Sequence, residues 1–70
     1  MILKFPDRGA RQHFTDLVTR ERPWLRSALE ESYALPYLLV DRISQEDAQW
    51  IKGHIGTLGR AFEDRRVDLF

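Results

Sequence analysis

Apolar residues recur at helical spacing in the first half of the chain. Between residues 8 and 34 eight apolar residues occupy one arc of about 140° when drawn at ~100° per residue. These residues are Ala10, Phe14, Leu17, Val18, Trp24, Leu25, Ala28 and Leu29. Asp7 precedes the segment and is suited to cap it. The pattern predicts an amphipathic helical arm over residues 8–34 that Pro23 bends without reversing.

A second helical pattern follows Ser44, which stands as an N-cap before two acidic residues. Apolar positions again step by three and four, at Ala48, Ile51, Ile55, Leu58 and Phe62. The pattern predicts a second helix over residues 45–66 with this seam in the core.

Three glycines interrupt the second helical pattern, at Gly53, Gly56 and Gly59. A phosphate-binding loop is excluded, because its lysine follows the last glycine whereas Lys52 precedes the first. Each glycine costs about 0.8–1 kcal/mol relative to alanine inside a helix. Two interpretations remain open: a tolerated weakness or kink, and a bare strip that a partner approaches closely.

The stretch "SQEDAQWIKG", residues 44–53, resembles the first helix and turn of helix-turn-helix repressors. The resemblance covers about ten residues and implies DNA binding. The sequence departs from the repressor pattern at Gln49, Lys52 and Gly59, where that motif has a small residue, an apolar residue and a branched apolar residue.

The segment between the two arms, residues 35–43, contains Pro36 and the apolar run "YLLV". It is interpreted as a connector, with helix, strand and coil all left open. Two arms joined in this way form an antiparallel hairpin. The apolar face of the second arm is wider than the first arm alone could bury. The predicted fold is therefore a single all-α domain, residues 1–70, completed as a homodimeric four-helix bundle. The alternative is an α+β fold in which "MILKF" pairs antiparallel to "YLLV".

Composition supports self-association. A 70-residue chain buries only about 60% of its unfolded surface, and such domains often add disulfides, a metal or a second subunit. The chain has no cysteine, and its two histidines are not spaced as metal ligands. Eleven basic residues balance eleven acidic ones, so no overall field favours DNA or a membrane. The first residues lack the apolar segment of a signal peptide, so we expect a cytoplasmic protein.

No pattern in the sequence predicts catalysis, a cofactor or a bound metal. The serines lack the glycines of a nucleophile elbow. Glu30 and Glu31 are adjacent, so on a helix they point about 100° apart and cannot act as a paired acid and base. His54 follows Trp50 by four positions and is expected to stack beside it.

Partner binding is the remaining kind of activity. Arg8, Arg11, Arg22 and Arg26 would share one flank of a continuous first arm, either as a binding strip or as a solvated face. Interfaces are enriched in tryptophan, tyrosine and arginine. The predicted partner-binding residues are Arg11, Arg22, Arg26, Tyr37 and Trp50.

The sequence predicts a small regulatory or adaptor protein that binds another protein and modulates or inhibits it. One alternative is a nucleic-acid-binding regulator that uses the arginine flank or a degenerate helix-turn-helix. Another is a structural subunit of a larger assembly.

Overall fold

The structure is a computed structural model that describes residues 1–62. Its elements in chain order are β1 (Ile2–Lys4), α1 (Arg8–Glu21), the 3₁₀ helix η1 (Pro23–Ala28), β2 (Leu29–Glu31), β3 (Tyr37–Val40), α2 (Gln45–Ile55) and β4 (Arg60–Phe62). Strands make up four of these elements, so the all-α prediction is wrong and the fold is α+β. The two arms needed for a four-helix bundle are not present.

The strands form one antiparallel sheet in the order β2-β3-β1-β4. In its centre, Leu3 of β1 faces Leu38 of β3 on one side and Ala61 of β4 on the other. The alternative pairing of "MILKF" with "YLLV" is thus confirmed. Helix α1 connects β1 to β2, and α2 connects β3 to β4, so each connection crosses over one intervening strand. This is the βαββαβ order of the ferredoxin-like arrangement.

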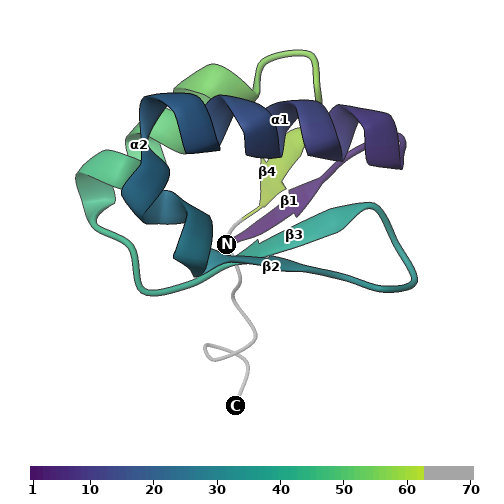
Figure 1. Ribbon diagram of the computed structural model, residues 1–70, viewed down its shortest axis with the longest axis horizontal. Helices are drawn as coiled ribbons and strands as arrows, with labels where there is room; N and C mark the ends of the chain where they lie inside the picture. Colours follow the sequence, from purple (N-terminus) through teal and green to yellow (C-terminus); the bar gives the residue numbers. More distant parts are fainter. Residues whose placement is uncertain (63–70) are drawn as a thin grey trace.

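Both helices lie on the same side of the sheet (Figure 1). Side chains alternate between the two faces of a strand, so every second strand residue points toward the helices. The core lies in that layer and consists of Leu3, Phe5, Phe14, Val18, Leu25, Leu29, Leu38, Val40, Ile51 and Ile55. Within residues 1–62, no helix is long and apolar enough to cross a membrane.

The first predicted arm is divided into three elements. Asp7 caps α1 as expected, its Oδ1 accepting a hydrogen bond from the Ala10 amide at 2.7 Å. The helix ends at Glu21 because Pro23 lacks an amide hydrogen and its ring disfavours helical geometry in the preceding residue. Pro23 then starts η1, and the chain continues into β2, where Leu29 pairs with Val40. The bent continuous helix over residues 8–34 is therefore wrong.

The second helix begins as predicted, with the Ser44 hydroxyl accepting a hydrogen bond from the Asp47 amide at 3.1 Å. It ends at Ile55, not at residue 66, because Gly56 adopts φ +52° and ψ −129°, a conformation that glycine adopts readily. The chain then turns into β4; residues 63–66 of the predicted helix lie outside the described part. Phe62, predicted in the core, is 43% exposed on the helix-free side of the sheet.

Gly59 has a different role from the other two glycines. A Cβ built at this position would overlap the Lys4 carbonyl oxygen and would lie 2.7 Å from Cδ1 of Phe5. The missing side chain lets the chain entering β4 approach the end of β1. At Gly53, in contrast, a Cβ would meet nothing within 4 Å.

These two glycines give a matched pair of alanine substitutions. Gly59→Ala should lower the free energy of unfolding by about 1–3 kcal/mol, because the added methyl group overpacks the β1–β4 contact. Gly53→Ala should raise it by about 0.5–1 kcal/mol through better helix propensity. Urea denaturation monitored by circular dichroism measures both. Equal effects of the two substitutions would contradict the assigned geometry.

Candidate binding surfaces

Arg11 holds the β2–β3 hairpin against α1. Its Nη1 donates to the carbonyl oxygens of Ser32 at 3.0 Å, Leu35 at 3.2 Å and Tyr37 at 3.4 Å. Its Nη2 lies 3.6 Å from a carboxylate oxygen of Glu31, and the Arg11 side chain is only 11% exposed. The Leu35 and Tyr37 carbonyl oxygens also accept backbone amide hydrogen bonds, from Tyr37 and Ser32 respectively. Arg11 therefore adds donors that gather three carbonyl groups of the turn around one guanidinium.

The arginine strip predicted on the first arm is not present as a single surface. Arg8 and Arg11 both donate to carbonyl oxygens of the β2–β3 hairpin, Arg8 to Tyr33 at 2.7 Å. Arg22 lies beyond the end of α1 and contacts α2. The helix-turn-helix resemblance also fails structurally, because Gly53 lies inside α2 and a strand follows that helix.

Arg22 is the centre of a second group of contacts, which joins η1 to α2. Its Nη1 forms an ion pair with Oδ1 of Asp47 at 2.7 Å, with side chains 22% and 14% exposed. Its guanidinium carbon lies 5.5 Å from the ring centroid of Trp24 and 5.3 Å from that of Trp50. These are cation–π distances, so the arginine is held by two rings and one carboxylate.

His54 extends this group along α2. Its ring stacks on Trp50 with centroids 4.3 Å apart and planes 18° from parallel, which confirms the predicted neighbour pair. A ring nitrogen, Nδ1, lies 2.8 Å from the Trp50 carbonyl oxygen. Arg22, Trp24, Asp47, Trp50 and His54 are called the tryptophan cluster below.

Asp47 is the acceptor of the tryptophan cluster. Burial acts to raise the pKa of its carboxyl group, but hydrogen bonds from Arg22, Trp24 and Ser44 and the Arg22 charge together lower that pKa below its ordinary value. The carboxylate accepts from Trp24 Nε1 at 3.3 Å as well as from Arg22. One charge thereby orients both the guanidinium and the indole.

Trp24 is nevertheless 61% exposed. Arg26, two residues further along η1, is also exposed, and its side chain makes no hydrogen bond or ion pair within residues 1–62. Buried Leu25 lies between them and anchors η1 to the core. A large exposed indole, fixed by a hydrogen bond and an adjacent cation, and an exposed arginine are thus two residues apart on η1.

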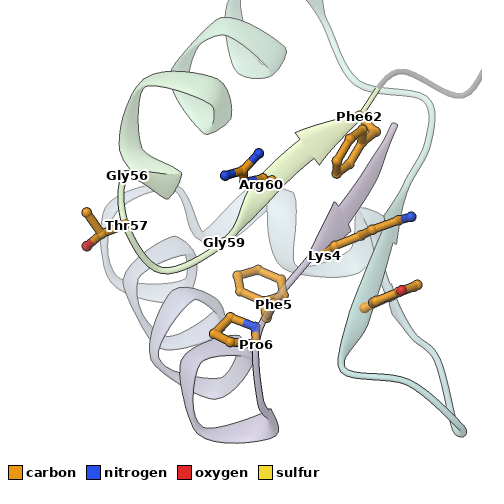
Figure 2. Close-up of a pocket in the computed structure, with 9 residues that line it drawn as sticks. Lys4, Phe5, Pro6, Gly56, Thr57, Gly59, Arg60 and Phe62 are labelled. Atoms are coloured by element: carbon orange, nitrogen blue, oxygen red, sulfur yellow. The ribbon is translucent and has the colours of Figure 1, made fainter.

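The helix-free side of the sheet is the second candidate surface. Its alternating residues, called the sheet face below, are Ile2, Lys4, Glu30, Tyr37, Leu39, Arg60 and Phe62. Lys4 Nζ lies 5.2 Å from the ring centroid of Tyr37 and 4.9 Å from that of Phe62. A groove of about 670 Å³ begins here. It runs from Phe62 past Lys4 to Pro6 and the α2–β4 loop (Figure 2).

The five predicted partner-binding residues are therefore spread over the molecule. Arg22 and Trp50 meet in the tryptophan cluster, and Arg26 lies nearby on η1. Tyr37 is on the sheet face, and Arg11 supports the hairpin. Sequence reasoning missed Lys4 and Arg60, whose only signal was the alternation of charged and apolar residues in strands of three residues.

The described residues show no arrangement suited to metal chemistry: within 1–62, no three histidine, cysteine, aspartate or glutamate side chains come together. In comparisons with known proteins, no family model, no curated protein and no solved structure matches the chain significantly. The function must therefore be argued from these surfaces.

The Arg11 contacts predict a structural effect that a merely solvated arginine would not have. Arg11→Lys should lower the free energy of unfolding by about 1–3 kcal/mol, because an ammonium group cannot reach the same set of carbonyl oxygens. Arg20→Lys, at an exposed position of α1, is the control and should change it by less than about 0.5 kcal/mol. Urea denaturation at pH 7 compares them. Equal stability of both variants would show that the hairpin does not depend on Arg11.

Asp47 predicts a pH dependence. A carboxyl group with a lowered pKa in the folded state stabilises the protein above the unfolded value near 4, and this contribution is lost as the pH falls through the folded pKa. Asp47→Asn should therefore be less stable than the wild type at pH 7, and the difference should shrink below about pH 4. Chemical denaturation at pH 7 and pH 3 tests this. A stability difference between wild type and Asp47→Asn that is as large at pH 3 as at pH 7 would contradict the lowered pKa of Asp47.

Proposed function

We propose that this protein is a non-enzymatic regulatory or adaptor protein that binds another protein through the tryptophan cluster and Arg26. The observation that supports this most strongly is Trp24, which is 61% exposed although its indole is held by Asp47 and Arg22. The part of an apolar side chain that stays in water contributes no hydrophobic stabilisation, however large its surface area. Its exposure is explained if a partner covers it.

The fixed orientation of Trp24 is the second part of the argument. Binding costs entropy for each side chain that becomes ordered, and a side chain that is already held loses less. Tryptophan and arginine are the residues most often found at energetic centres of interfaces. The geometry therefore suits a partner with an apolar pocket for the indole and a carboxylate within reach of Arg26.

The nucleic-acid alternative has less structural support. It relied on the arginine strip, and Arg8, Arg11 and Arg22 are each engaged by carbonyl or carboxylate groups of the chain itself. Neutralising phosphates requires cations that are free to pair with them. Arg26 is the one member of that strip whose side chain has no hydrogen bond or ion pair among residues 1–62.

The proposal is tested by quantitative affinity purification with wild type and three variants of the tagged protein. Trp24→Ala and Arg26→Glu should each reduce recovery of a shared partner protein by at least about tenfold, as expected for central interface residues. Tyr33→Ala is the matched control, since Tyr33 is 99% exposed but lies in the β2–β3 turn. It should recover the partner as the wild type does.

Circular dichroism melting curves show whether each variant is folded. Arg26→Glu matters most here, because the Arg26 side chain has no intrachain hydrogen bond or ion pair within residues 1–62 to lose. Recovery of the same proteins by all four forms, or of no specific protein by the wild type, would refute the proposal.

A further inference from the structure

The sheet face presents two rows of side chains across the strands. The register aligns Glu30, Leu39, Ile2 and Phe62 in one row, from β2 at one edge to β4 at the other. A second row contains Tyr37, Lys4 and Arg60. The centre of the first row is therefore apolar, with Leu39 and Ile2 side by side on the two middle strands.

Opposite charges occupy the two edges of this face. Glu30 is on β2, whereas Arg60 is on β4, and both are exposed. Neither has an ion pair or hydrogen bond through its side chain within residues 1–62. Lys4, beside Arg60 in the same row, places a second cation toward the β4 side. The face thus has an acidic edge on β2, an apolar pair at the centre of its first row, and two cations on the half formed by β1 and β4.

We propose that a second copy of this chain covers the sheet face, with the two sheets packed face to face about a two-fold axis parallel to the strands. This rotation places β2 of one protomer over β4 of its partner, and β3 over β1. Leu39 then meets the partner's Ile2, and Glu30 comes over the strand that carries the partner's Arg60. Tyr37 faces the partner's Lys4, which repeats across the interface the cation–π pairing of these two residues within one chain.

The charge pattern selects this occupant and this axis. A two-fold interface brings the same patch of both subunits together, so the patch must complement itself. An axis across the strands would place β2 over β2 and set the two Glu30 carboxylates against each other. The axis parallel to the strands places the acidic edge of each protomer over the basic edge of the other, so the favourable pairing occurs twice in the dimer. Sheets packed in this way lie about 10 Å apart with strands within ~30° of each other.

The size of the face sets the strength of the dimer. Strands of three or four residues span only about 10–13 Å. Four such strands offer less area than the roughly 800 Å² per partner of a standard stable interface. The dimer should therefore dissociate at accessible concentrations, with a dissociation constant in the micromolar range.

Sedimentation velocity of the full chain from roughly 1 μM to 1 mM tests this, since the range brackets such a constant. The wild type should change from monomer to dimer across it. Glu30→Arg and Arg60→Glu should each weaken the dimer by about tenfold, because each variant places like charges over each other twice. The double variant Glu30→Arg/Arg60→Glu should recover wild-type dimerisation within about threefold.

Arg20→Glu is the control, because it makes the same charge change as Arg60→Glu but at an exposed position of α1. It should dimerise like the wild type. A monomeric wild type at all concentrations, single variants that behave like the control, or a double variant that stays weakened would each overturn the proposal. A chain ending at Phe62 that dimerises when the full chain does not would identify residues 63–70 as the occupant, and would also overturn it.

The dimer and the partner site are separable. The sheet face is on the opposite side of the sheet from the helices that carry the tryptophan cluster (Figure 1). Glu30→Arg should therefore keep partner recovery, and Trp24→Ala should keep the dimer. Failure of one proposal would leave the other standing.

Discussion

Strand β1 is paired along both of its edges, with β3 on one side and β4 on the other. Backbone bonds extend the β3 pairing, from the Met1 amine to the Val40 carbonyl at 3.0 Å and from the Phe5 amide to the Pro36 carbonyl at 3.1 Å. Without β1, no backbone hydrogen bonds between strands would join the β2–β3 hairpin to β4. Because strand residues alternate, β1 also separates Leu3 in the core from Lys4 on the sheet face. Both the closure of the sheet and the division into layers depend on it.

The sequence was sufficient where the interactions that decide a structure are local. The caps at Asp7 and Ser44 depend on residues three positions away, and the buried faces of the true helices follow their 3.6-residue period. Strands of three residues contain too few alternations to be distinguished from helical spacing. What fixes β2 and β4 is pairing with strands distant along the chain, which a local pattern does not contain.

The same reasoning explains the outcome at the candidate surfaces. Trp50 and Arg22 were predicted as partner-binding residues from their residue types and, for Arg22, its place on a flank of the first arm. Their meeting depends on η1 turning toward α2. Arg11 was assigned to partner binding because no hairpin was predicted for it to hold. Asp47 already had a local explanation as an acidic residue at a helix N-terminus, so its long-range pairing with Arg22 had no separate signal.

A protein of two layers has two outer surfaces, and in this one the two differ in chemistry. The helix layer exposes a fixed indole and, two residues along η1, an arginine whose side chain is unpaired within residues 1–62. This layer suits a heterologous partner, whereas the charges on the sheet side complement a copy of themselves. A dimer through the sheet would leave both tryptophan clusters facing outward, one on each side. Two linked sites of this kind bind a repeated or dimeric partner much more tightly than either site alone, provided that the geometry lets both engage at once. A weak dimer through the sheet face would then strengthen partner binding at the tryptophan clusters, although it adds no contact between either cluster and the partner.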